Sequence, residues 1–126
     1  MSTNQRVSEP RVPMASVVIL REAPSPEQMT ELLGVFETFI KLAVDVRREV
    51  VAAGGEMHAD CEQTLLEDGS RQEDVWGADW VPDDNSVRFE ALINIRPRQS
   101  NFQMEIQDPE RRMQVERVVR RIFEGV

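Results

Sequence analysis

The chain has 126 residues, 40% of them apolar, and a formal net charge of −8. A chain of this length and composition forms one globular domain, which argues against a multidomain enzyme and against a disordered protein. The acidic excess argues against general binding to nucleic-acid phosphates. The single cysteine, Cys61, excludes an internal disulfide and favours a reducing, cytoplasmic location.

The first fifteen residues are polar and contain two prolines, which predicts a flexible tail at residues 1–15 and a single domain at residues 16–126. No apolar stretch approaches the roughly 18–20 residues that cross a bilayer, and the N-terminus lacks the apolar segment of a signal peptide. We therefore expect a soluble protein without a membrane contact. The β-branched run from Ser16 to Leu20 predicts a short buried strand.

The first predicted helix has a strong start signal. Ser25 is a good N-cap, Pro26 suits the first helical position, and Gln28 stands where a capping box needs Glu or Gln. Apolar residues then recur at three- and four-residue steps as far as Val50, and glycines follow at residues 54–55. This pattern predicts one long helix from Pro26 to about residue 53.

Residues 57–66 allow two interpretations. Polar and apolar residues alternate, which is typical of a strand with His58, Asp60 and Glu62 on its polar side. A short helix competes, with Asp60 as its N-cap and Gly69 after its last turn. The strand is favoured because the Asp-Gly pair that ends at Gly69 is typical of a hairpin turn.

The second half of the chain predicts two strands and a helix. Residues 75–81 have good strand propensity, and residues 82–85 form a turn. Residues 86–96 alternate most clearly between apolar and polar side chains, which predicts a strand over the whole segment. Asp108 as N-cap and Pro109 at the first helical position predict a final helix.

These elements predict an α+β domain. An antiparallel sheet of three to five strands would be covered on one face by an N-terminal and a C-terminal helix. The result would be a two-layer sandwich whose other sheet face is polar.

That polar face is the predicted functional site. A strand at residues 57–66 would place a histidine and two carboxylates beside the polar side chains of residues 86–96. A histidine next to carboxylates can act as a general base, and an arginine can hold an anion through two parallel hydrogen bonds. The predicted catalytic residues are His58, Asp60 and Glu62. The predicted ligand-binding residues are Trp76, Asn94, Arg96, Arg98, Asn101 and Glu105.

Several structural readings compete with this site. Paired charges on a solvated sheet face explain the same pattern without a ligand, and Trp76 fits core packing as well as stacking on a ligand. Three side chains on one flat strand diverge, so His58, Asp60 and Glu62 predict no metal site. Cys61 is expected to be a buried structural residue rather than a nucleophile. The cofactor is left open.

Four short motifs follow one another along the chain: Gly-Gly-Glu-x-His-Ala-Asp-x-Glu at residues 54–62, Asp-Gly-Ser at 68–70, Trp-Gly at 76–77 and Asn-Ile-Arg-Pro at 94–97. Together they resemble a family of small, single-domain bacterial proteins classed only as a domain of unknown function, over about residues 16–124. The resemblance implies a soluble domain with no assigned activity. Its matched positions are largely polar, which favours a site over a plain solvated face. These positions are His58, Asp60, Glu62, Ser70, Asn94, Arg96, Asn101 and Glu105.

Two functions stay open. The first is a pocket that binds or transforms a small anionic ligand, in which case Arg96→Ala should abolish binding and leave the melting curve intact. The second is a protein–protein interaction or regulatory module that meets a partner or a second copy through residues 56–90, which hold eleven acidic and two basic residues. Neither function predicts contact with nucleic acid. No complete triad, phosphate loop or zinc motif is present, so whether the protein is an enzyme stays open.

Overall fold

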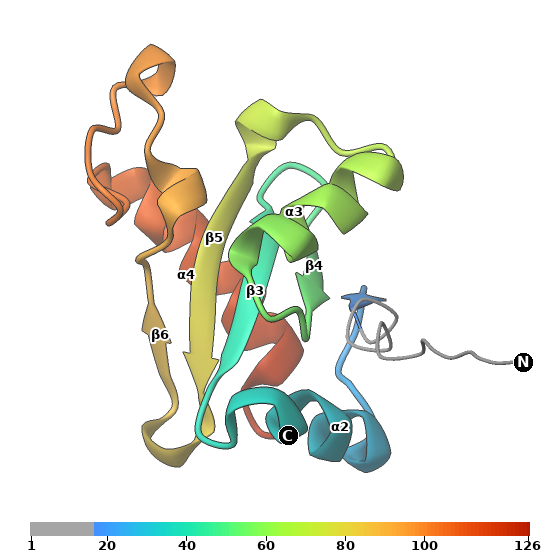
Figure 1. Cartoon of the computed structure of the whole chain (residues 1–126). Coiled ribbons are helices and arrows are strands. Elements are labelled where there is room, and N and C mark those ends of the chain that lie inside the picture. The colour runs from blue at the N-terminus through green and yellow to red at the C-terminus, as the bar shows by residue number, and fades with distance from the viewer. Residues whose placement is uncertain (1–16) are drawn as a thin grey trace, which may run out of the picture.

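The structure is a computed structural model that describes residues 17–126, and the predicted tail at residues 1–15 lies outside this range. The described part of the chain contains three α-helices and five strands (Figure 1). The strands are Val18–Leu20 (β2), Ile40–Asp45 (β3), Val50–Ala53 (β4), Val75–Val81 (β5) and Ser86–Arg88 (β6). The helices are Pro26–Phe36 (α2), His58–Glu67 (α3) and Pro109–Phe123 (α4).

The five strands form one antiparallel sheet in the order β2-β4-β3-β5-β6. The longest ladder joins β3 to β5, from the pair Ile40 and Trp80 to the pair Asp45 and Val75. The α+β class and the antiparallel sheet predicted from the sequence are therefore confirmed.

Helices lie against both faces of the sheet. On one face, Leu42 and Trp76 belong to a core cluster that includes Leu32 of α2 and Ile122 of α4. On the other face, a smaller cluster packs strand residues against α3, and Figure 1 shows α3 and α4 on opposite sides of β3. Its members are Ala43, Val50, Ala52, Cys61, Leu65 and Val75. The predicted two-layer arrangement with one polar face is not found, because α3 covers part of that face.

The helix start signals are confirmed. The Ser25 hydroxyl accepts a hydrogen bond from the backbone N–H of Gln28, and the Gln28 side chain accepts one from the N–H of Ser25, which completes the capping box. Asp108 caps α4 by accepting from the N–H of Glu110.

The predicted long helix from Pro26 to residue 53 is wrong after Phe36. The chain leaves the helix at Glu37, which has a φ of 70°, and then forms the hairpin of β3 and β4. The Asp45 carboxylate supports the hairpin turn by accepting from two backbone N–H groups at 2.9 Å. Both strands are buried on both faces, so their apolar residues run almost continuously. Such a run fits a helical period as well as a strand, which is why the sequence predicted a helix.

Residues 57–66 form the helical alternative rather than the favoured strand. Helix α3 begins at His58, two residues before the predicted cap Asp60, and Gly69 follows its end with a φ of 106°. Cys61 and Leu65 lie one turn apart and face the sheet, which stabilises the helix by burying both side chains.

The strand predicted over residues 86–96 is correct only for Ser86–Arg88. Beyond it the chain leaves the sheet ladder, with short helical turns at Leu92–Asn94 and Pro97–Gln99. Side chains from this irregular segment occupy the sheet edge that a longer strand would have paired with.

Candidate functional site

Three charged side chains form a row across the sheet face that carries α3. Lys41 of β3 lies directly opposite Asp79 of β5, and Asp79 lies directly opposite Arg88 of β6. Side chains paired across antiparallel strands point to the same face and stand close together. The row therefore alternates a positive, a negative and a positive group.

The first residue of α3 places its imidazole on this row. His58 Nε2 lies 2.8 Å from Asp79 Oδ1 and 3.2 Å from the carbonyl oxygen of Ala78. Because both neighbours are acceptors, Nε2 carries a proton and donates it, which leaves Nδ1 as the unprotonated nitrogen of the neutral ring. The His58 and Asp79 side chains are only 12% and 11% exposed. The pair has the arrangement in which a carboxylate orients a general base.

An aromatic pair supports the two basic ends of the row. The rings of Phe36 and Phe39 stack with their centroids 4.8 Å apart. Lys41 Nζ lies 4.9 Å from the centroid of Phe36, and the guanidinium carbon of Arg88 lies 4.5 Å from that of Phe39. Arg88 Nε is also 3.4 Å from Asp79 Oδ2. These contacts hold the guanidinium in place, yet its N–H groups make no hydrogen bond within residues 17–126.

The row forms the polar side of a cavity of about 460 Å³. This volume lies within the usual range of small-molecule sites. Glu90 adds a second carboxylate to the lining. The other walls are apolar, and they are formed by Phe39, Met57, Ala59, Ala91, Leu92, Ile93 and Met104.

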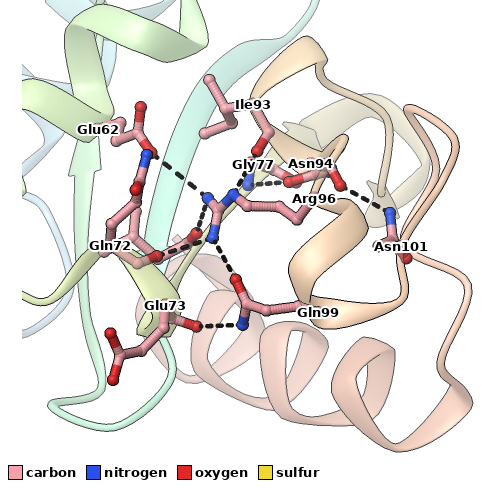
Figure 2. Close-up of polar contacts among 10 residues, drawn as sticks. Glu62, Gln72, Glu73, Gly77, Ile93, Asn94, Arg96, Gln99 and Asn101 are labelled. Carbon is pink, nitrogen blue, oxygen red and sulfur yellow. Dashed lines mark hydrogen bonds and ion pairs between the residues drawn. The ribbon is translucent and has the colours of Figure 1, made fainter.

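Arg96, in contrast, is enclosed by the protein (Figure 2). Its side chain is 10% exposed, and each of the five N–H groups of its guanidinium has a protein acceptor. The acceptors are the carbonyl oxygens of Gln72, Val75 and Ile93 and the side chains of Glu62 and Gln99, at 2.6 to 3.4 Å. Burial lowers the pKa of Arg96, an effect that Glu62 opposes and Arg111 reinforces. The guanidinium joins α3, the start of β5 and the segment at residues 92–99.

Asn94 completes the edge of β5 where β6 has ended (Figure 2). Its fully buried side chain accepts from the N–H of Gly77 at 2.8 Å and donates to the Gly77 carbonyl oxygen at 3.0 Å. It also donates to the carbonyl oxygen of Phe89 at 3.2 Å. The side-chain amide of Asn94 thus makes the hydrogen bonds to Gly77 that a residue of a neighbouring strand would make. A Cβ at Gly77 would lie 2.5 Å from that of Ala91, so this close approach requires glycine.

Three other predicted ligand-binding side chains also have protein partners, and Arg98 lies at a different place on the surface. Asn101 is buried and donates to the carbonyl oxygen of Asn94 at 2.7 Å. Trp76 is fully buried, with the guanidinium groups of Arg96 and Arg111 at 4.6 and 4.4 Å from its ring. Glu105 is exposed and pairs with Arg112 at 3.0 Å. Arg98 is exposed and lines a second groove, of about 620 Å³, formed by residues 95–99 and 72–73.

The predicted catalytic residues are divided between two places. His58 and Glu62 lie one turn apart on the same side of α3, but His58 contacts Asp79 in the cavity and Glu62 contacts Arg96. Asp60 lies on the opposite side of the helix. The catalytic and ligand-binding roles proposed for all these residues stay predictions.

Three residues of the row, Lys41, Asp79 and Arg88, were not predicted as site residues from the sequence. Lys41 was placed inside the long helix, which concealed its position on a strand. Arg88 and Asp79 were on predicted strands, but the register that pairs them was unknown. One signal was available: Asp79 is the only charged residue in the apolar run of β5.

Cys61 lies on the side of α3 that faces the sheet, and its Sγ is 3.6 Å from the carbonyl oxygen of Lys41. Burial, the largest cause, raises the pKa of the Cys61 thiol to about 11. We expect native Cys61 to react with iodoacetamide about a hundredfold or more slowly than in the urea-unfolded chain, because little thiolate forms and the sulfur is covered. Mass spectrometry of timed samples would measure both rates. Equal rates would contradict the buried position.

The same shift predicts a loss of stability in alkali. The folded state holds the Cys61 proton more tightly than the unfolded state, so the contribution is complete below pH 9.0 and falls as pH rises towards about 11. Melting temperatures of the native chain and of Cys61→Ala, measured across this pH range, would show how much of the loss of stability comes from the thiol. A parallel decline in both would contradict the assignment.

Two general features concern the described residues. Within residues 17–126, no group of three or more His, Cys, Asp or Glu side chains is arranged to hold a metal ion. None of the helices in that range has the length and apolar character needed to cross a membrane.

Comparison with known proteins gives one match. Residues 18–122 match a family described as a protein of unknown function, DUF5674. The chain belongs to this family. The resemblance to an uncharacterised single-domain family is therefore confirmed, and the family's region covers the whole sheet, the three helices and the cavity. No curated protein and no solved structure matches the chain.

Proposed function

We propose that this domain binds a small anionic ligand in the cavity beside α3 and offers His58 as a general base or acid towards it. The observation that carries the proposal is the state of Arg88. Its guanidinium is held by the Phe39 ring and by Asp79, which Nε faces at 3.4 Å, yet its terminal N–H groups have no hydrogen-bond acceptor within residues 17–126. A preoriented guanidinium with free donors is suited to a carboxylate or a phosphate.

Two neighbouring groups support an anion at this place. Lys41 Nζ makes one hydrogen bond, to the carbonyl oxygen of Glu56, and an ammonium has three donors. Helix α3 begins at the cavity with no side chain capping its N-terminus, so its first N–H groups and its dipole also favour negative charge. Asp79 orients His58, whose Nδ1 is the nitrogen that can exchange a proton with a ligand.

The proposal moves the anion-binding role from Arg96 and Arg98 to Arg88 and Lys41. Arg96 has no free donor. The alternative of an interaction module that uses the acidic surface at residues 56–90 stays a prediction. Part of that acidic charge is balanced within the fold, since Asp68 pairs with Arg48 and Arg21. A cytoplasmic location also stays a prediction, which cell fractionation would test.

The test compares two arginine variants in an NMR titration with acetate and with inorganic phosphate. We expect at least one of these probes to shift the Arg88 Nε–H signal and the amide signals of His58 and Ala59. Arg88→Met should weaken this binding about tenfold or more, because it removes the one guanidinium that lines the cavity. The melting temperature should change little, since the Arg88 side chain is half exposed.

Arg98→Met is the matched control. Arg98 is exposed and does not line the cavity, so its loss should leave the titration unchanged. If Arg98→Met abolished binding and Arg88→Met did not, the anion site would lie in the groove at residues 95–99 and the proposal would be wrong.

A further inference from the structure

The cavity has apolar walls that a small inorganic anion would not contact. We infer that its ligand is a monocarboxylic acid with an apolar chain of about six to ten carbons, an inference that rests on the function proposed above. The carboxylate would bind Arg88, with the positive charge of Lys41 in the same cavity, and the chain would cover the apolar walls. Three features of the cavity favour such a ligand: its charge, the planar guanidinium of Arg88 and its apolar surface.

The charge of the lining favours one negative charge over two. Lys41 and Arg88 bring two positive charges to the cavity, and Asp79 and Glu90 bring two negative ones. Asp79 already has His58 and Arg88 as partners, but Glu90 has no ion pair among the described residues. A phosphate dianion would be repelled by these carboxylates in a partly desolvated site, whereas a monoanion gains the Arg88 contact at a smaller cost.

The head-group contact favours a planar anion. The Arg88 guanidinium packs over the Phe39 ring, and both residues line the cavity. A planar carboxylate can accept two parallel hydrogen bonds from such a fork. Lys41, at the other end of the row, also lines the cavity and adds positive charge to it.

The apolar walls favour a chain attached to this head group. Among the described residues, exposed large apolar side chains are uncommon, and three of them, Met57, Leu92 and Met104, line this cavity. Leu92 is 69% exposed, and an apolar chain bound in the cavity would remove part of this apolar surface from water. Methionine side chains adapt to flexible partners, so the two methionines suit an alkyl chain better than a rigid ring.

The experiment is a calorimetric titration of the full chain with acetate, butanoate, hexanoate and octanoate. We expect affinity to rise about threefold for each added methylene, because each one moves from water to the apolar walls. Octanol, which has the chain without the charge, and inorganic phosphate, which has charge without the chain, should each bind at least tenfold more weakly than octanoate.

A matched pair of variants tests the walls. Leu92→Asn should weaken octanoate about fivefold or more and leave acetate unchanged. Met113→Asn is the control, because Met113 is equally exposed at 69% but lies on α4, outside the cavity lining. Both residues are exposed, so neither variant should affect folding.

The outcomes separate this inference from the function on which it rests. Equal affinity along the series, tighter phosphate, or equal octanol and octanoate would each overturn the carboxylic acid inference. In the first two cases anion binding that depends on Arg88 would survive, and the proposed function with it. Absence of binding by every anion in the series would overturn both.

Discussion

Replacing Arg96 with alanine is expected to lower the free energy of unfolding by about 3 kcal/mol and the melting temperature by roughly 10–15 °C. The substitution removes five hydrogen bonds and leaves three main-chain carbonyl oxygens and the partly buried Glu62 carboxylate without this partner. It also uncovers one face of the Trp76 ring. Thermal and urea unfolding, followed by circular dichroism, would measure the loss.

Two further variants make this result specific. Arg96→Lys should recover little of the stability, because an ammonium has three donors and cannot reproduce the planar arrangement of five. Arg98→Ala should change stability by less than about 0.5 kcal/mol, since Arg98 is exposed. If Arg96→Ala kept its melting curve and lost binding of anions, Arg96 would have the ligand role that the sequence pattern suggested.

Asn94→Ala is expected to cost about 3 kcal/mol, by a different route. The substitution leaves the N–H and the carbonyl oxygen of Gly77 without their side-chain partner inside the protein, together with the carbonyl oxygen of Phe89. Asn94→Asp should be at least as harmful, because a carboxylate cannot donate to those two carbonyl oxygens and would be buried. Urea unfolding would give the free energies.

Amide hydrogen exchange would show which part of the fold is destabilised by Asn94→Ala. The Gly77 amide should exchange slowly in the native chain and much faster in Asn94→Ala, since its only acceptor is the Asn94 side chain. Gln103→Ala serves as a control at an exposed position of the same irregular segment. Unchanged protection of Gly77 in Asn94→Ala would show that the strand edge does not depend on this amide.

The parts of the fold that depend on local chemistry could be predicted from the sequence. Ser25 with Gln28, and Asp108 with the proline that follows it, cap their helices through bonds between near neighbours. Residues 40–53 could not be assigned, because a strand buried on both faces loses the alternation that identifies strands. Asp45, whose carboxylate accepts from the N–H groups of Arg47 and Arg48, is a residue type that favours turns, and it was not used as a turn signal.

The candidate site could be predicted only in part, for a related reason. His58 was identified because it is the single histidine and lies in a polar motif. Its partner Asp79 is twenty-one residues away and comes near only through the packing of α3 on the sheet. Lys41 and Arg88 join them through strand register, which depends on long-range pairing rather than on local sequence.

The polar motif at residues 94–97 shows that a polar signature need not mark a ligand site. Asn94 and Arg96 both bind main-chain groups of β5, and Asn101 binds the main chain of Asn94 in turn. A buried amide can both accept from and donate to a strand edge, as Asn94 does, whereas the Arg96 guanidinium only donates. In a sequence, such buried polar residues look the same as residues that bind a ligand.

The side chains that complete the edge of β5 also affect how copies of the chain meet one another. An unpaired strand edge is a template for a strand from another molecule and so a route to aggregation. Near the start of β5, Arg96 and Asn94 already occupy the groups through which an incoming strand would bind. Variants that remove either side chain are therefore expected to precipitate during heating and to bind amyloid dyes more readily than equally destabilised core variants.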